Sequence, residues 1–253
     1  MQLLRSSVAA LGLSALALAS ACQRGGYQPK AQLAPVTAQP VGKSIPDDPR
    51  AAATIAPYRQ RVTEQMTSVL GTAPVALTKN SGESPLANFV ADLQRERASR
   101  ELKQPIDLGV MTNGGLRAPI PAGPVTLGSV FELMPFENEL VVLDAPGPVV
   151  QQLFDYAARI KMAVSGAVYT VGPDGKPQNI LIGGQPFSPT RTYTIAISDY
   201  LAGGGDNLAF FKAIRPRGTG VLLRSAIADY MREQTQQGKP IEAKVEGRVK
   251  GIN

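Results

Sequence analysis

The chain has 253 residues, 43% of them hydrophobic and 18% charged, which is enough for a sizeable domain with its own core. It contains no histidine and a single cysteine, Cys22, which excludes Ser-His-Asp and Cys-His catalysis, histidine-containing metal sites, cysteine-based zinc clusters and an intrachain disulfide. The net charge of +6 comes from short basic runs without interleaved aromatic residues, so we expect a solvated basic surface and no binding of nucleic acid.

The first residues have the pattern of an export signal. Arg5 precedes an apolar run over residues 8–19, too short to span a bilayer but suited to secretion. The run ends in Ala19-Ser20-Ala21-Cys22, which resembles a bacterial lipobox with alanine where leucine is preferred. We therefore predict a lipoprotein signal peptide over residues 1–21 and an exported protein, anchored through lipidated Cys22 to a bacterial membrane on its periplasmic or cell-surface side. The alternative is ordinary cleavage after Ala21, with Cys22 as a spare thiol.

Residues 22–50 contain five prolines and no hydrophobic periodicity. Proline fixes φ and removes a backbone donor, so this stretch is predicted to be an extended, disordered tether.

Residues 51–253 are predicted to form one folded domain. Ser84 and Pro85 are a cap and a first-turn proline for one helix, and Pro173-Asp174-Gly175 is the turn of a hairpin. The expected helices cover residues 50–70, from 85 onward, 126–133, 148–163 and 226–234, and the expected strands cover 75–78, 106–111, 139–144, 167–171, 179–182 and 192–198. Because helices and strands interleave irregularly, we expect an α+β domain rather than a doubly wound sheet.

Three loops of the domain combine glycine, aromatic and polar residues. The first is Asn113-Gly114-Gly115-Leu116-Arg117, the second is Pro135-Phe136-Glu137-Asn138, and the third runs from Asp199-Tyr200 through Gly204-Gly205 to Asp206. Glycine lets a backbone approach a ligand closely, and two aromatic rings can hold a flat base while amide and carboxylate groups bind its edge or a ribose. Each loop also has a plain structural explanation as a turn or a core residue. From the residues alone, the prediction is a pocket for a planar ligand.

Taken in order and spacing, these loops resemble the C-terminal domain of the bacterial and animal 5′-nucleotidase family. The helix start Glu83-Ser84-Pro85-Leu86-Ala87-Asn88 has the family pattern too, and the resemblance extends from about residue 56 to 246. It implies a single mixed α/β domain of the 5′-nucleotidase C-terminal type that binds a nucleotide.

The resemblance also implies roles for individual residues. Phe136 and Tyr200 would stack on the base, Asn138 and Asp206 would contact base or ribose, and Arg117 would lie near the phosphate. The remaining candidates are the loop residues that shape the site: Asn113, Gly114, Gly115, Gly204 and Gly205. Family enzymes often have further arginines before the helix that starts at Glu83, where this chain has Leu77-Thr78-Lys79-Asn80.

Full-length family members place a metallophosphatase domain with two metals before this domain, and a chain without histidine cannot reproduce those ligands. We therefore expect no catalytic residue, metal or cofactor here, and divalent metals in a separate metallophosphatase chain to which this one supplies substrate specificity. The first alternative is a stand-alone nucleoside- or nucleotide-binding lipoprotein without catalytic role. The second is a structural lipoprotein whose loops are only turns.

Overall fold

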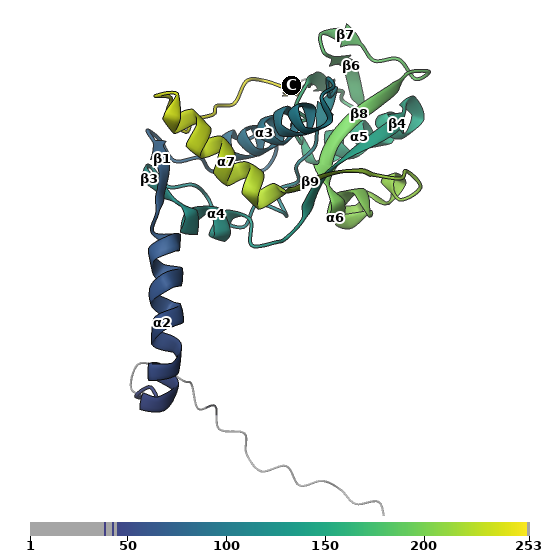
Figure 1. Ribbon diagram of the computed structural model, residues 1–253. Coiled ribbons are helices and arrows are strands. Elements are labelled where there is room, and N and C mark those ends of the chain that lie inside the picture. Colours follow the sequence, from purple (N-terminus) through teal and green to yellow (C-terminus); the bar gives the residue numbers. More distant parts are fainter. Residues whose placement is uncertain (1–37, 39–41, 43–44, 252–253) are drawn as a thin grey trace, which may run out of the picture. The chain divides into compact units, whose positions relative to one another are not determined.

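The computed structural model describes residues 38, 42 and 45–251, and the chain from Arg50 onward forms one compact unit (Figure 1). The predicted signal peptide, Cys22 and most of the predicted tether lie outside the described residues. The helices are α2 Pro49–Met66, α3 Pro85–Leu102, α4 Leu127–Leu133, α5 Gly147–Ile160, α6 Asp199–Ala202 and α7 Leu223–Gln236, with short 3₁₀ turns η1 Gly205–Asn207 and η2 Ala209–Phe211. The strands are β1 Val69–Ala73, β2 Leu108–Gly109, β3 Gly123–Thr126, β4 Glu139–Pro146, β5 Ala167–Val171, β6 Pro177–Ile182, β7 Gln185–Pro186, β8 Thr192–Ser198, β9 Arg217–Leu222 and β10 Val249–Gly251.

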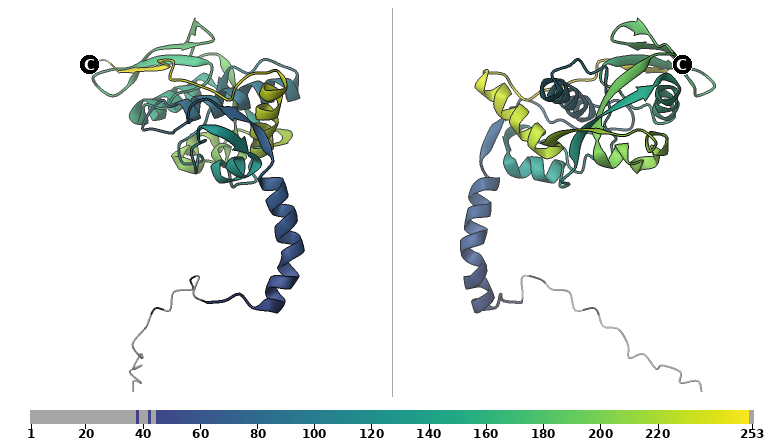
Figure 2. Two further views of the ribbon diagram at one scale, coloured as in Figure 1. Left: turned by 90° about the vertical axis from the view of Figure 1, so that its left-hand side faces the viewer. Right: turned by 45° about the vertical axis from the view of Figure 1, so that its right-hand side comes forward.

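A mixed four-stranded sheet in the order β2-β8-β4-β9 is the centre of the domain. β2 runs parallel to β8, and β4 is antiparallel to both of its neighbours. Side chains alternate along β4: Val141 and Leu143 pack with Phe154 of α5, whereas Leu140 and Val142 pack with Ala98 of α3. The sheet is therefore the middle of three layers, with α5 on one face and α3 on the other (Figure 2).

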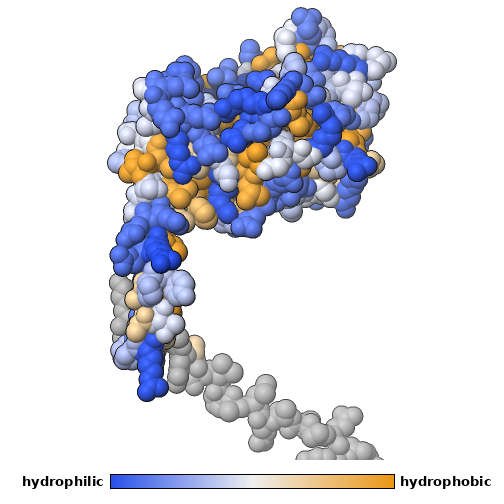
Figure 3. Space-filling model, in the orientation of Figure 1, coloured by the Kyte–Doolittle hydropathy of each residue, from blue (hydrophilic) through white to orange (hydrophobic). Residues whose placement is uncertain are grey.

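Two smaller sheets complete the fold. β10, β5, β6 and β7 form the second four-stranded sheet, and β1 pairs with β3. A second core lies between α3, α4, α7 and the β1–β3 pair, with Leu86, Phe89 and Met231 buried in it. The face in Figure 3 is mostly hydrophilic, with apolar patches on the side of β1, β3 and α4.

Local chemistry explains where the helices begin and end. The Ser84 hydroxyl accepts from Ala87 N at the start of α3, and Lys103 ends that helix in the left-handed conformation at φ 52°. Thr126 and Ser129 form a reciprocal capping box at the start of α4. These are the helix starts expected from the sequence at Ser84 and Thr126.

The α+β prediction is confirmed, and the predictions around residue 70 need correction. The first helix ends at Met66 instead of 70, and none of its residues is buried. Gly71, which directly follows the predicted helix, lies within β1, where a side chain would collide with Thr235 and Ile241. The strand expected at 75–78 is reduced to one bridge between Leu77 and Ile120. The strand predicted over 106–111 is confined to Leu108–Gly109.

Candidate functional site

All three loops meet at one cleft of about 380 Å³. We call them the Asn-Gly-Gly loop (residues 112–117), the Pro-Phe loop (135–138) and the Gly-rich loop (199–206). Their predicted residues that line the cleft are Gly114, Gly115, Arg117, Phe136, Asn138, Tyr200 and Asp206. The topology explains the convergence, because the Asn-Gly-Gly loop follows β2 and the Gly-rich loop follows β8, which lie parallel in the central sheet.

The first and third loops are joined through Asp206. Thr112 Oγ1 donates to Asp206 Oδ2 at 2.5 Å, and the Tyr200 hydroxyl donates to Asp206 Oδ1 at 3.2 Å. Asp206 has φ 50° and ψ 35°, a left-handed conformation that aspartate tolerates better than most residues. Gly114 leaves the space for it, since a Cβ there would lie 2.7 Å from Asp206 Oδ2. The carboxylate, which lines the cleft, is thus held by two hydroxyl donors.

The Pro-Phe loop is joined to both other loops. Asn138 Nδ2 donates to Asp199 Oδ1 at 2.9 Å in the Gly-rich loop. The guanidinium carbon of Arg117, in the Asn-Gly-Gly loop, lies 5.8 Å from the centroid of the Phe136 ring, within the range of a cation–π contact. Each pair of loops is therefore connected by at least one side-chain contact, so the three form a single unit.

The two aromatic residues line this cleft with their rings accessible. Phe136 is 40% exposed and Tyr200 is 53% exposed, although both are residues that a globular domain normally buries. They come from different loops, and the cleft also has apolar walls of Met111, Met134 and Leu223. Accessible rings from two different loops, beside apolar side chains, are suited to stacking on a flat ligand.

Three predicted residues, Asn113, Gly204 and Gly205, do not line the cleft. Asn113 Nδ2 donates to Asn80 O at 2.7 Å, which fastens the Asn-Gly-Gly loop to the segment before α3. Gly204 has φ 92°, a left-handed conformation that favours glycine, and Gly205 lies so close to the Tyr200 ring that a side chain would collide with it. These residues shape the loops.

Six cleft residues were not among the sequence candidates: Met111, Thr112, Met134, Ser198, Leu201 and Leu223. A signal was present for most of them, because Thr112 directly precedes Asn113, Met134 and Ser198 directly precede the Pro-Phe and Gly-rich loops, and Leu201 lies within the Gly-rich loop. Leu223 had no such signal in the sequence, because it reaches the cleft only through the packing of α7.

The start of α7 supports the Pro-Phe loop. Leu223 N donates to Asn138 O at 2.8 Å. The side chain of Arg224 is only 12% exposed; its guanidinium lies 4.2 Å from the centroid of the Phe131 ring and donates to Phe136 O at 3.4 Å. The backbone that presents the Phe136 ring is therefore held from behind by α7.

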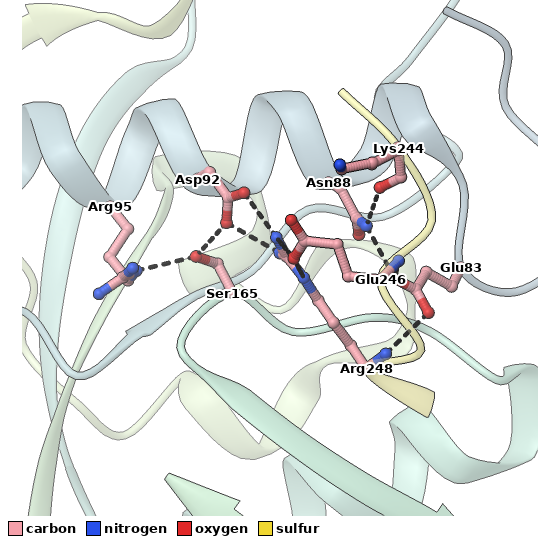
Figure 4. A network of polar contacts seen from close by, with 8 residues as sticks. All are labelled: Glu83, Asn88, Asp92, Arg95, Ser165, Lys244, Glu246 and Arg248. Carbon is pink, nitrogen blue, oxygen red and sulfur yellow. Dashed lines mark hydrogen bonds and ion pairs between the residues drawn. The ribbon is translucent and has the colours of Figure 1, made fainter. Parts of the chain in front are cut away.

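The Glu83–Asn88 motif lies outside the cleft and fastens the C-terminal segment instead (Figure 4). The Glu83 carboxylate accepts from the backbone N–H groups of Glu246 and Arg248 at 2.9 Å, and Asn88 Nδ2 donates to Lys244 O. Arg248 in turn makes two hydrogen bonds to Asp92 of α3, at 2.8 and 2.6 Å. This network places β10 beside β5.

The described residues do not fit a metal centre. Histidine, cysteine, aspartate and glutamate nowhere gather in groups of three or more that could hold an ion in this part of the chain. We therefore derive no step through a metal bound by these residues. Over the same residues, no helix is both long and apolar enough to cross a membrane.

Fold and cleft together define a mixed α/β domain with a cleft at one end of its central sheet, lined by the loops that follow β2 and β8 and by the loop that precedes β4. The family described as 5′-nucleotidase, C-terminal domain, matches residues 63–213. The chain belongs to the 5′-nucleotidase C-terminal domain family.

Individual relatives agree with this assignment. Protein UshA from Salmonella pullorum is 33% identical over 145 residues, which cover 54% of this chain and 25% of that protein. A 5′-nucleotidase from Vibrio vulnificus is 28% identical over 177 residues, 66% of this chain and 31% of the relative. The structure of a 5′-nucleotidase precursor from Thermus thermophilus superposes with a TM-score of 0.67 at 27% identity, covering 83% of this chain and 45% of that one. The chain thus spans less than half of each.

Proposed function

We propose that this chain recognises a nucleoside or nucleotide and supplies substrate specificity to a separate metallophosphatase chain. The observation that carries the proposal is that two accessible aromatic residues, Phe136 and Tyr200, line one cleft together with Asp206. Base stacking on aromatic side chains contributes about 1–3 kcal/mol per base, so two rings supply much of the affinity for a nucleoside.

The polar groups of the cleft complement this arrangement. Asp206 offers carboxylate lone pairs to the hydroxyls of a sugar, because each of its oxygens has used only one acceptor position on a protein donor. Asn138 keeps its Oδ1 for the edge of a base while its Nδ2 is bound to Asp199. Arg117 is exposed at the cleft and makes no ion pair within the described part of the chain, which leaves its guanidinium available to an anionic group of the ligand.

Calorimetric titration with nucleosides and their 5′-monophosphates tests recognition. We expect binding by the purified protein, and a loss of at least about tenfold in affinity for Phe136→Ala and for Tyr200→Ala, since each removes one stacking surface. Tyr200→Phe keeps the ring and removes only the hydroxyl bond to Asp206 Oδ1, so comparison with Tyr200→Ala separates the loss of stacking from the loss of that bond. Absence of binding to every nucleoside and nucleotide, with and without a copurifying partner, contradicts the proposal.

The partnership with a metallophosphatase rests on the chemistry that this chain lacks. Without histidine it cannot supply the imidazole ligands of a dimetal phosphatase, and the described carboxylates are not clustered. We expect the native protein to purify in stoichiometric complex with a metallophosphatase, and nucleotide hydrolysis to require both chains. If it purifies alone and still binds a nucleoside, it acts as a stand-alone binding protein.

The proposed location is a bacterial membrane surface, through lipidation of Cys22. Mass spectrometry of the N-terminal peptide tests this: a diacylglyceryl adduct on Cys22 supports it, and an unmodified thiol contradicts it.

A further inference from the structure

Helix α2 has no buried residue, although it is 18 residues long and has Pro57 inside it. Most of the stability of a helix in a protein comes from packing of an apolar face, and an interior proline removes a backbone hydrogen bond. We therefore expect this helix to pack on a surface that the domain itself does not supply.

One face of α2 is apolar and exposed. Ile55, Tyr58 and Val62 are 47%, 68% and 52% exposed. At 3.6 residues per turn, their side chains lie within a sector of about 60° around the helix axis. We call these three residues the α2 stripe. Apolar residues at this spacing normally form the contact face of an amphipathic helix.

The charges of α2 are arranged around this stripe. Arg59 and Arg61 flank it, about 70° and 90° to either side of its centre, and Glu64 lies about 150° away on the far side, where it accepts from Gln60 Nε2 at 2.9 Å. Neither arginine makes an ion pair within the described part of the chain. Arginines beside an apolar stripe can lay their stems along it while their charged heads meet anionic groups. This is the pattern of a helix that lies on an anionic lipid surface.

The predicted lipid anchor keeps such a surface within reach. Pro49 lies 27 positions after Cys22, and 27 residues extend over at most about 95 Å. Because anchor and helix belong to one chain, docking of the helix is intramolecular, and a weak affinity for lipid is enough. A stable protein interface uses about 20–30 residues a side, far more than the three side chains of the α2 stripe. Charge and chain length therefore favour lipid over a protein partner.

We propose that α2 lies flat on the anionic surface of the membrane that holds the anchor, with its stripe at the boundary of headgroups and acyl chains. The inference rests on the proposed lipidation of Cys22 and does not depend on the ligand of the cleft. Only Thr67 and Ser68 separate α2 from β1. The Ser68 hydroxyl donates to Gln65 O at 2.6 Å, and Ser68 O accepts from Leu127 N at 2.9 Å. Because the link is short and bonded on both sides, docking of α2 holds the domain close to the membrane.

The test uses the absence of tryptophan from the sequence, because a single introduced indole then reports on one position. Tyr58→Trp places the indole in the α2 stripe, and Ala53→Trp, exposed on the opposite face of the helix, is the matched control. Each variant is purified as the full lipidated chain and reconstituted into vesicles of phosphatidylcholine, alone or mixed with an equal part of phosphatidylglycerol.

In the anionic vesicles we expect the Tyr58→Trp emission to shift to shorter wavelength, and quenching by brominated lipids to place the indole about 5–10 Å deep. Ala53→Trp should keep the emission of an indole in water. No shift in Tyr58→Trp, or the same shift in both variants, overturns the inference. A shift that grows with the number of copies per vesicle also overturns it, because a second copy then covers the stripe. So does a shift that requires an added metallophosphatase.

The flanking charges are tested in the Tyr58→Trp background by Arg59→Gln combined with Arg61→Gln. Each arginine near an anionic surface contributes about fivefold, so the pair should lower the ratio of docked to undocked helix about 30-fold. Lys176→Gln combined with Lys250→Gln removes the same charge from exposed positions elsewhere and should leave the ratio unchanged. An equal effect of the two pairs overturns the inference, because the attraction is then a property of the net charge.

Failure of the inference can be told apart from failure of the proposals on which it rests. An unmodified Cys22, found by mass spectrometry of the same samples, overturns the anchor and the docking together, whereas a lipidated Cys22 without the shift overturns the docking alone. Nucleoside affinity of the α2 variants should equal that of the wild type, because the stripe does not line the cleft. Absence of nucleoside binding by the wild type contradicts only the function proposed for the cleft.

Discussion

Thr112 and Asp206 lie 94 positions apart, and their side chains form a 2.5 Å hydrogen bond that joins the Asn-Gly-Gly loop to the Gly-rich loop. Thr112→Val keeps the shape of the side chain and removes the donor. Asp206 Oδ2 then loses its protein partner, so we expect nucleoside affinity to fall about tenfold and the free energy of unfolding by about 1–2 kcal/mol. Calorimetry and denaturant unfolding measure the two. Thr190→Val, at an exposed hydroxyl pair with Ser188, is the control. Unchanged affinity in Thr112→Val would show that Asp206 needs no support.

Gly114→Ala tests the close approach of the same carboxylate. The new Cβ would lie 2.7 Å from Asp206 Oδ2, so the carboxylate has to move from its two hydroxyl donors. We expect nucleoside binding to fall at least tenfold with a loss of only about 1–3 kcal/mol in stability. At Gly251 a Cβ meets no atom within 4 Å, so Gly251→Ala is the matched control. Wild-type binding by Gly114→Ala would contradict a role for Asp206 in binding the nucleoside.

Arg224 is expected to act on ligand binding through the Pro-Phe loop. Arg224→Ala removes its contacts with the Phe131 ring and with Phe136 O, so the loop loses its support from α7. We expect about a tenfold loss of nucleoside affinity, a partial recovery in Arg224→Lys, and a smaller effect on stability of about 1–2 kcal/mol. Arg232→Ala, on the exposed side of the same helix, should change neither quantity beyond about 0.5 kcal/mol. Full affinity in Arg224→Ala would mean that the loop holds its own conformation.

Arg248 is expected to matter for stability and not for the ligand. Burial lowers the pKa of Arg248, but its hydrogen bonds to Asp92 and Glu246 raise that pKa by more, so the net shift favours the cation. Arg248→Met leaves the two carboxylates without their shared partner, and we expect thermal or denaturant unfolding to show a loss of about 1–3 kcal/mol. Nucleoside affinity should stay at the wild-type value, because the network in Figure 4 lies outside the cleft. A selective loss of affinity in a stably folded Arg248→Met would disprove this separation.

Tyr169 should make the protein lose stability in alkaline solution. Burial, and to a lesser extent the charge of Glu83, raise the pKa of Tyr169 well above its ordinary value of 10.0. The unfolded tyrosine ionises near pH 10 while the folded one stays protonated, so its contribution to stability is complete below pH 10 and declines above it, by up to about 1.4 kcal/mol per pH unit. Denaturant unfolding at a series of pH values measures this decline.

Tyr169→Phe should reduce the alkaline slope, at a cost of about 1 kcal/mol for the lost hydrogen bond to Met162 O. Tyr156 and Tyr230 also have raised pKa values, caused first by burial, so part of the slope remains. The control is Tyr58→Phe at an exposed position of α2. An identical slope in wild type and Tyr169→Phe would contradict the assignment.

Local sequence signals predicted the helices that begin at a capping residue and the longest buried strand. Ser84 with Pro85, and Thr126, mark helix starts through their own side chains, and the alternation in 192–198 predicted β8 directly. β1, β3 and β9 had no comparable signal, because each is short and is stabilised by pairing with a distant segment. Gly71 shows the ambiguity: the same glycine would end a helix or fill a tight place in a strand, and only its contact with Thr235 and Ile241 decides between them.

The sequence alone determined that this chain has no histidine and one cysteine, and which loops contain aromatic, amide and carboxylate groups. Residue type and local spacing can be read directly from a sequence. Only the tertiary structure decided which of these groups line the cleft. Parallel pairing of β2 with β8 brings Thr112 to Asp206, and packing of α7 brings Leu223 to the cleft. It also decided that Lys79 braces the Asn-Gly-Gly turn and that Glu83 holds the C-terminal segment, since a charged side chain acts on whatever partner the fold places within hydrogen-bond distance.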